Sequence, residues 1–119
     1  MALRAHDGPT PSTKSTTIGG RVEFTAKVEN SGQADESVFL SVEELKEGAL
    51  GKPVAFAFSF DPPAVGLRAK SRSRIGFSWT AALPPEKPAF TFRGKLVLRR
   101  TTDGALIATA PLDLYVSEA

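Results

Sequence analysis

The sequence predicts an all-β protein, an immunoglobulin-like antiparallel β-sandwich of about seven strands. Three observations lead to this prediction. Apolar and polar residues alternate with a period of two in six separate runs, which is typical of strands with one buried face. Turn signals rich in Gly, Pro, Asn and Asp separate these runs every 8–15 residues. Strands with one apolar face must bury those faces against each other, and two packed sheets do so, with a barrel as the alternative.

Length and composition indicate one folded domain over residues 1–119. The apolar fraction of 41% and the charged fraction of 24% are those of globular proteins, and the chain is long enough to bury a core unaided. The chain has no cysteine, which excludes disulfides, thiolate zinc sites and cysteine nucleophiles. No apolar run approaches the roughly 20 residues of a membrane span, and we expect no secretory signal at the start.

The N-terminal part begins with a short strand expected at residues 2–6. The polar stretch "HDGPTPSTKST" then reads as an arm or a loop within residues 1–19, ahead of a main sandwich at 20–116. "RVEFTAKVEN" is the first long strand, and Asn30-Ser31-Gly32 is a turn because Asn and Gly tolerate a left-handed backbone. "ESVFLSVEEL" is the next strand, and Gly48 and Gly51 favour a loop over a helical turn at residues 44–48.

The later strands follow the same alternation. "PVAFAFSF" ends at Asp61-Pro62-Pro63, since consecutive prolines cannot continue a ladder. "RSRIGFSWT", "AFTFRGKLVLRR" and "ALIATAPLDLYV" follow, with a proline-rich loop before the second and a hairpin turn at "TTDG" before the third. The side chains expected to face the core are Val22, Phe24, Ala26, Val28, Val38, Leu40, Val42, Val54, Phe56, Phe58, Phe60, Leu67, Ile75, Phe77, Trp79, Phe90, Phe92, Leu96, Leu98, Leu106, Ala108, Ala110, Leu112, Leu114 and Val116.

Four stretches resemble one known family. "TIGGRVEFTAKVENSGQAD", "SVFLSV", "VGLRAKSRSRIGFSWT" and "FRGKLVLRRT" are similar to the CARDB-like immunoglobulin-like modules of bacterial and archaeal surface proteins. The similarity runs from about Thr17 to Val116 and rests on core hydrophobes and turn residues. It implies the sandwich fold and a non-catalytic role in adhesion, spacing or assembly, at the surface of a cell or of a virus-like particle.

Catalytic and metal-binding chemistry is poorly represented. His6 is the only histidine, whereas a metal site or a Ser-His-Asp relay needs imidazole or thiolate groups held by further residues. Glu43 and Glu44 are neighbours on a strand and point to opposite faces, which does not suit the paired acids of a glycosidase. The acids between residues 35 and 47 match no calcium-loop spacing. We expect no enzyme activity, no metal, no cofactor and no small-molecule substrate.

The stretch "GLRAKSRSRIGFSW" has a base at every second position from residue 68 to residue 74. Four bases along one strand would suit the phosphates of a nucleic acid. Single-strand binders interleave aromatic residues with such bases, but Phe77 and Trp79 have the opposite, inward parity. The family resemblance also places residues 68–71 in a turn. Only two of the bases then remain on the strand, opposite the strand that carries Glu23, Lys27 and Glu29, and we expect no nucleic-acid partner.

The expected docking surface is the outer face of the sheet formed by the strands "ESVFLSVEEL", "AFTFRGKLVLRR" and "ALIATAPLDLYV". A contiguous exposed apolar patch usually marks an interface, and outward positions there include Pro111 and Arg99 beside the residues named below. Opposite charge between an acidic region at 35–47 and a basic region at 68–74 would also suit contacts between copies of the chain. The candidate interaction residues are Phe39, Val97, Ile107, Tyr115, Arg93, Lys95, Arg72 and Arg74.

These observations together predict a non-catalytic structural or interaction module with a protein partner or with self-association. It would dock onto a larger particle, filament or envelope. Two alternatives remain open, namely a carbohydrate- or protein-binding adhesion module excised from a larger surface protein, and a domain similar to the intracellular proteinase inhibitors.

Overall fold

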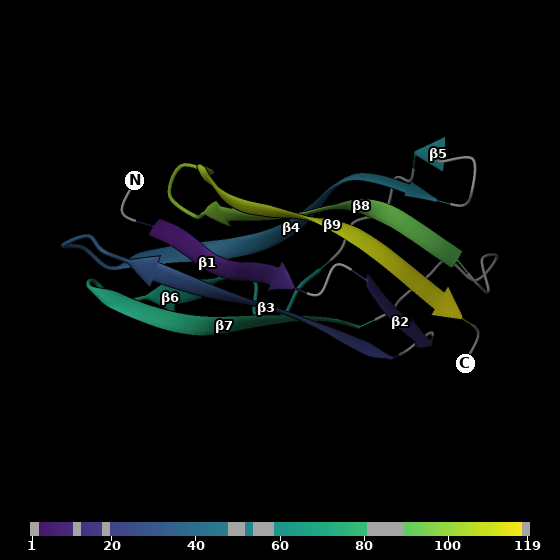
Figure 1. The fold of residues 1–119 in the computed structure, drawn as a ribbon, viewed down its shortest axis with the longest axis horizontal. Helices are drawn as coiled ribbons and strands as arrows, with labels where there is room; N and C mark the ends of the chain where they lie inside the picture. The colour runs from purple at the N-terminus through teal and green to yellow at the C-terminus, as the bar shows by residue number, and fades with distance from the viewer. Residues whose placement is uncertain are drawn as a thin grey trace.

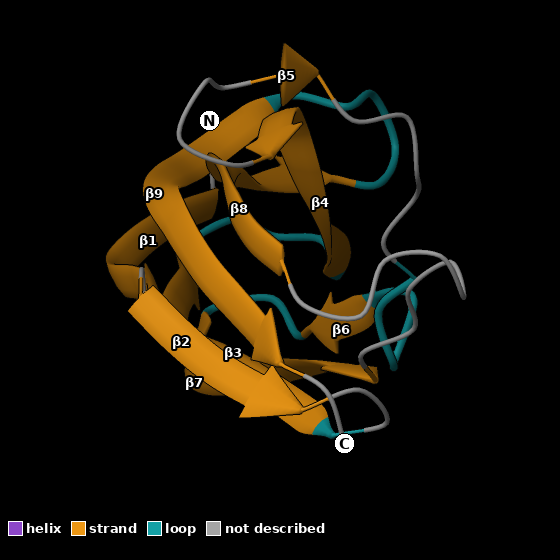
Figure 2. Cartoon of the chain, turned by 90° about the vertical axis from the view of Figure 1, so that its right-hand side faces the viewer, coloured by secondary structure: helices purple, strands orange, loops and turns teal. Residues whose placement is uncertain are grey.

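The computed structural model describes residues 3–10, 13–17, 20–47, 52–53, 59–80 and 90–117, which form nine strands and no helix. The strands are β1 (Leu3–Thr10), β2 (Thr13–Thr17), β3 (Arg21–Asn30), β4 (Glu36–Glu47), β5 (Lys52–Pro53), β6 (Val65–Leu67), β7 (Ser71–Thr80), β8 (Phe90–Arg100) and β9 (Leu106–Ser117). A three-stranded sheet, β1-β3-β7, faces a six-stranded sheet, β2-β9-β8-β4-β5 with β6 beside β4 (Figure 1). Figure 2 shows the two layers end-on. The predicted immunoglobulin-like sandwich is confirmed.

The N-terminal segment contributes to both sheets. β1 pairs antiparallel with β3, and β2 pairs parallel with β9. The structure therefore differs from the expected polar arm or loop, because most of "HDGPTPSTKST" is strand. Gly8 and Pro9 lie at the second of two register shifts in β1, the one between Asp7 and Thr10. Edge strands tolerate proline at such irregular positions, so turn-forming residues here do not indicate a loop.

β3 and β7 form the most regular part of the small sheet. They pair without a register shift from Arg21 opposite Thr80 to Asn30 opposite Ser71. The predicted inward side chains of both strands are at most 5% exposed, and the charged residues between them lie on the outer face. The register therefore determines which charges of the two strands are neighbours.

β4 continues through Glu47, where a loop was expected. A bulge between Glu43 and Lys46 keeps the strand paired with β8, and Glu44 has a positive φ of 54° within it. Gly94 of β8 lies against this bulge, and a Cβ there would come within 3.0 Å of the Glu43 carbonyl oxygen. The absence of a side chain at position 94 thus lets the two backbones approach closely.

The hairpin between β8 and β9 has the turn predicted at "TTDG". Gly104 has a φ of 71°, and its N–H donates to the Arg100 carbonyl oxygen at 2.9 Å. The Asp103 carboxylate accepts hydrogen bonds from the Arg100 guanidinium and, at 3.0 Å, from the N–H of Ala105. These bonds, with the Arg100 contribution the largest, hold the pKa of Asp103 far below its ordinary value.

Asn30 is a buried polar residue that joins the two sheets at one end. Its Oδ1 accepts from the N–H of Gly32 at 3.1 Å, which closes the predicted turn. Its Nδ2 donates to the carbonyl oxygens of Ala34 at 2.9 Å and of Leu67 at 3.2 Å. Leu67 belongs to β6 of the other sheet, so this one side chain connects the layers. The sequence predicts the turn but not this connection.

The core lies between the layers. Most predicted core residues are buried or packed against the buried cluster, and Phe60 contacts Phe24 edge-to-face with ring centroids 5.9 Å apart. Ala110 is half-buried outside this cluster, and Leu106 is 53% exposed, contrary to expectation. The expectations for Val54, Phe56 and Phe58, for the side chain of Phe90 and for the proline-rich loop at 81–89 lie outside the described residues.

Candidate functional site

Among the described side chains, the outer face of the six-stranded sheet does not show the expected apolar patch. Val97 is only 2% exposed, Ile107 packs against the core, and Phe39 is half-buried. Tyr115 is exposed as expected, and Leu106 is exposed against expectation. These two residues lie near opposite ends of β9, about 30 Å apart at the usual strand rise. They therefore form no continuous patch.

A bulge explains why Leu106 and Ile107 exchange places. Leu98 of β8 lies opposite Ala108 of β9, but the next residue, Arg99, lies opposite Leu106. The additional residue in β9 reverses the alternation, since a shift of one residue moves side chains to the other face of a sheet. An alternation counted along the whole strand therefore assigns these two residues to the wrong faces.

The Arg99–Glu43 ion pair explains the burial of Val97. Arg99 donates from Nε and from a terminal nitrogen to one carboxylate oxygen of Glu43, at 3.2 and 2.9 Å, and also to the Gly104 carbonyl oxygen at 2.9 Å. In the β4–β8 register, the Ser41–Val97 pair lies between the pair that contains Arg99 and the pair that contains Glu43. The side chains of Arg99 and Glu43 must therefore reach across Val97 to meet. This outward valine has a charged cover instead of solvent.

The other outward cations of β8 also have acidic neighbours. Lys95 lies 3.1 Å from Glu44, and Arg93 lies 3.3 Å from Asp113. Lys46, opposite Arg93, has no ion-pair partner among the described side chains. The described outer face of the six-stranded sheet thus pairs three cations with three acids and leaves one cation over.

The acidic region at 35–47 is also engaged within the chain. The Asp35 carboxylate accepts the N–H of Ala69 at 2.9 Å, in the basic turn itself, and Glu36 lies 4.0 Å from Arg100. Glu43 and Glu44 pair with β8 as described. The side chain of Glu47 lies outside the described residues. Complementary contacts between the acidic region of one copy and the basic region of another would need to displace these partners.

The outer face of the three-stranded sheet has a different arrangement. Arg72 and Arg74 lie on β7, as expected, and the turn before them covers positions 69 and 70. Arg72 is opposite Glu29, and a terminal guanidinium nitrogen of Arg72 lies 3.7 Å from a carboxylate oxygen of Glu29. Arg74, in contrast, is directly opposite Lys27. Lys27 has Asp7 of β1 in register on its other side, whereas no described carboxylate lies within ion-pair distance of Arg74. Like charges directly opposite each other destabilise a sheet.

Glu29 is the one described acid at this end of the face. It accepts a hydrogen bond from His6 Nε2 at 3.0 Å and lies close to Arg72. The His6 hydrogen bond, followed by the charges of Arg72, His6 and Arg4, lowers the pKa of Glu29 against the opposing effect of burial. Several cationic groups therefore share a single carboxylate.

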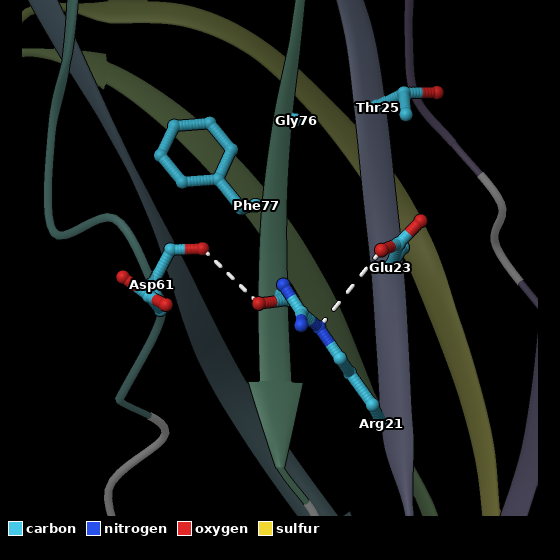
Figure 3. A pocket seen from close by; sticks show the side chains of 7 residues that line it. Arg21, Glu23, Thr25, Asp61, Gly76 and Phe77 are labelled. Atoms are coloured by element: carbon cyan, nitrogen blue, oxygen red, sulfur yellow. Dashed lines mark hydrogen bonds and ion pairs between the residues drawn. The ribbon is translucent and has the colours of Figure 1, made fainter.

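Two hollows lie on this face. One of about 410 Å³ is lined by His6, Lys27, Arg72, Ser73 and Arg74, and such a set can receive anionic groups. A second, of about 210 Å³, lies further along β3 and β7 beside Gly76 (Figure 3). There Asp61 exchanges two backbone hydrogen bonds with Ser78, at 2.8 and 2.9 Å, on the side of β7 away from β3.

Two other kinds of site, a metal centre and a membrane-spanning helix, do not occur in the described part of the chain. No group of three His, Asp or Glu side chains there could hold a metal ion. No helix long and apolar enough to cross a membrane occurs among the same residues. His6, the one imidazole, faces Glu29 on the open surface.

The eight candidate interaction residues therefore separate into three groups. Arg72 and Arg74 lie together with Lys27 and His6, which the sequence did not include. Arg93 and Lys95 are exposed but paired. Phe39, Val97, Ile107 and Tyr115 do not form one surface. The juxtaposition of Lys27 and Arg74 could have been found from the sequence, because a register that aligns the two alternating runs places these bases opposite each other.

Comparison with known proteins supports the fold. No protein-family model and no curated protein sequence matches the chain. Among solved structures, the chain is similar to the Pseudomonas fluorescens alkylpurine DNA glycosylase AlkC bound to DNA containing an abasic site analog. The identity is 16%, the TM-score is 0.59, and the match covers 95% of this chain and 30% of that one.

The chain is also similar to the CsuC–CsuE chaperone–tip adhesion subunit pre-assembly complex from Csu pili of Acinetobacter baumannii. The identity is 14% and the TM-score 0.51, over 92% of this chain and 55% of that one. A PapD-like domain of human CEP192 matches at 14% identity and a TM-score of 0.48, over 99% of this chain and 85% of that one. The chain thus spans about a third to a half of the glycosylase and pilus-complex chains that it matches.

Proposed function

We propose that the chain is a non-catalytic interaction module that docks onto a protein partner in a larger particle, filament or envelope. Its docking surface is the cationic face, defined as the outer-face residues Arg4, His6, Lys27, Arg72 and Arg74 of the three-stranded sheet. The observation that carries the proposal is the Lys27–Arg74 pair, two like charges held directly opposite each other beside an open hollow. An acidic partner would turn this unfavourable pair into a favourable contact.

A protein partner is the occupant that the face fits best. The cationic face spans three strands, about 10 Å at the usual strand spacing, so it reaches few phosphates at once. Nucleic-acid binders gain most of their affinity from many such contacts along a backbone. The pilus-complex neighbour contains a chaperone with its subunit, which is a protein–protein contact made with a similar fold.

Contact with nucleic acid is the second candidate. The glycosylase neighbour is bound to DNA, and the hollow lined by Lys27, Arg72 and Arg74 has the charge that a phosphate needs.

The membership in the CARDB-like group, an adhesion role and a surface location remain predictions from the sequence.

A matched pair of variants tests the docking surface. Lys27→Gln/Arg72→Gln/Arg74→Gln neutralises the cationic face, and Arg93→Gln/Lys95→Gln/Lys46→Gln removes the same charge from the other outer face. Partners captured from the source organism by the wild-type chain, after nuclease treatment, should be lost with the first variant and kept with the second. Equal capture by both variants would contradict the proposal, and capture that nuclease abolishes would favour nucleic acid. Light scattering identifies the case in which the partner is a second copy.

A further inference from the structure

The outer edge of β7 has backbone groups that find no partner among the described residues. Ser78 bonds to Asp61 on the side away from β3, and alternate residues of a strand direct their N–H and C=O groups to the same side. The N–H and C=O groups of Arg72, Arg74 and Gly76 therefore point to that side as well. No hydrogen bond of these groups on that side occurs within the described part of the chain. After Asp61 the chain leads to β6, which pairs with β4 in the other sheet.

This edge is open to solvent. Arg72, Ser73, Arg74 and Gly76 are all exposed, and Gly76 has no side chain of its own to contribute to that exposure. A Cβ at position 76 would meet no atom closer than 4.0 Å. An unpaired edge of this kind is a template for a further strand, and its charged side chains are the usual protection against indiscriminate pairing.

The side chains along the edge favour an added strand that carries negative charge. A strand added to β7 would place its outward side chains about 5 Å from those of Arg72 and Arg74, the distance of a cross-strand pair. Arg74 has only Lys27 across from it on the β3 side. A carboxylate from an added strand would therefore supply the missing opposite charge, and a lysine there would add a third cation.

We infer that the partner contributes an acidic extended segment, which adds as a strand to the β7 edge between Arg72 and Gly76. Main-chain hydrogen bonds to Arg72, Arg74 and Gly76 align the segment, and its outward carboxylates contact the two arginines at the hollow lined also by Lys27. This inference rests on the proposed function and adds to it the chemistry and the conformation of the partner.

Short synthetic peptides test the inference without a known partner. The probe has alternating Glu and Val, so that one face of its extended form is acidic. One control has Lys in place of Glu, and a second is the Glu–Val peptide with N-methyl groups on alternate residues, in either register, which removes its ladder donors. We expect the first peptide to bind and the controls to bind at least about tenfold more weakly, with affinity decreasing as salt is added.

Amide hydrogen exchange of the intact chain gives the sharper readout. The N–H groups of Arg72, Arg74 and Gly76 should exchange rapidly alone and slowly with the Glu–Val peptide. Those of Ser73, Ile75 and Phe77, which pair with β3, should be protected in both conditions. This alternation within one strand distinguishes strand addition from a general effect of binding.

Two variants complete the test. Arg74→Glu should lower the affinity for the Glu–Val peptide about tenfold or more, whereas Lys95→Glu on the other face should leave this affinity unchanged. Gly76→Pro removes one edge N–H without removing a bond to β3, and it should also abolish binding. Because proline within a strand also perturbs folding, the N-methylated peptide tests the main-chain ladder with the wild-type chain.

Each outcome has one meaning. Binding that depends on Arg74 but tolerates N-methylation and gives no alternating protection would overturn strand addition and leave the docking face standing. Absence of peptide binding, or equal binding by Arg74→Glu, would overturn strand addition and count against an acidic protein partner. If duplex DNA then bound in an Arg74-dependent way, the proposed function would fall with it.

Discussion

The two outer faces of the sandwich use their charges differently. On the six-stranded sheet Arg93, Lys95 and Arg99 each lie within 3.3 Å of a carboxylate, and one of these pairs covers Val97. On the three-stranded sheet several cations share Glu29, and Arg74 has a lysine opposite. Exposed ion pairs add little stability, about 0–1 kcal/mol each. The two faces therefore differ mainly in the electrostatic potential that each presents to a partner.

The strand positions sharpen this difference. Lys46, the described outer-face cation of the six-stranded sheet that has no ion-pair partner, lies on β4. This strand is paired there on both sides, with β8 and with β5. Arg74 lies on an edge strand, and the edge-facing N–H and C=O groups of Arg72, Arg74 and Gly76 have no partner within the described part of the chain. An unpaired cation at a sheet edge is accessible to a partner's main chain and side chains together, which is why we assign the docking role to this face.

The largest effect is expected at Asn30, which holds the end of the three-stranded sheet where the cationic face lies. Asn30→Ala removes three hydrogen bonds, among them the bond to the Leu67 carbonyl oxygen that joins the two sheets. We expect a loss of about 3 kcal/mol in the free energy of unfolding, measured by urea denaturation. A loss below about 1 kcal/mol would show that water or a rearranged turn replaces these bonds.

A smaller effect is expected where the six-stranded face covers its own valine. Arg99→Ala removes the bonds to Glu43 and to the Gly104 carbonyl oxygen and uncovers Val97. The unfolding free energy should fall by about 1 kcal/mol, because the pair is partly exposed. Arg99→Lys, which keeps the charge but not the forked geometry, should recover only part of it. Full recovery would show that geometry is unimportant there.

Acidification should affect the cationic face through Glu29. Because the pKa of Glu29 is lowered in the folded state, its stabilising contribution is present above the ordinary value of 4.5 and is lost as the pH falls through the lowered pKa. Glu29→Gln should therefore reduce the pH dependence of stability below about pH 5. Urea denaturation at several pH values measures this, and an unchanged slope would remove Glu29 from the account. Asp103 has a lowered pKa as well, so Asp103→Asn serves as the reference for a second acid.

The sequence predicted most of the fold because alternation reports the buried face of each strand. Alternate residues from Val22 to Val28 and from Ile75 to Trp79 are buried as expected, and the pairing of their strands follows from the sandwich. The expectations failed at irregular positions. The bulge near Leu106 reversed two side chains, and the bulge at Glu44 extended a strand into an expected loop. A bulge inserts one residue without a compositional signal, so a period-two pattern cannot locate it.

The candidate site was less predictable. Arg72 and Arg74 were placed correctly, opposite the strand of Lys27. The sequence did not predict that Arg74 directly faces Lys27 or that His6 lies beside them, because both follow from the register of three strands. Nor did exposure follow from parity alone, since Val97 is outward yet covered by a charge pair formed between β4 and β8.

The most direct test of the difference between the faces is urea unfolding of Arg74→Glu with and without the Glu–Val peptide, with Lys95→Glu as the matched variant. Arg74→Glu should raise the free energy of unfolding by about 0.5 kcal/mol, because it places a carboxylate opposite Lys27, and the peptide should no longer shift its midpoint. Lys95→Glu should lower stability, since it faces Glu43 and Glu44, and keep the peptide-induced shift. A destabilised Arg74→Glu, or one that the peptide still stabilises, would contradict the account.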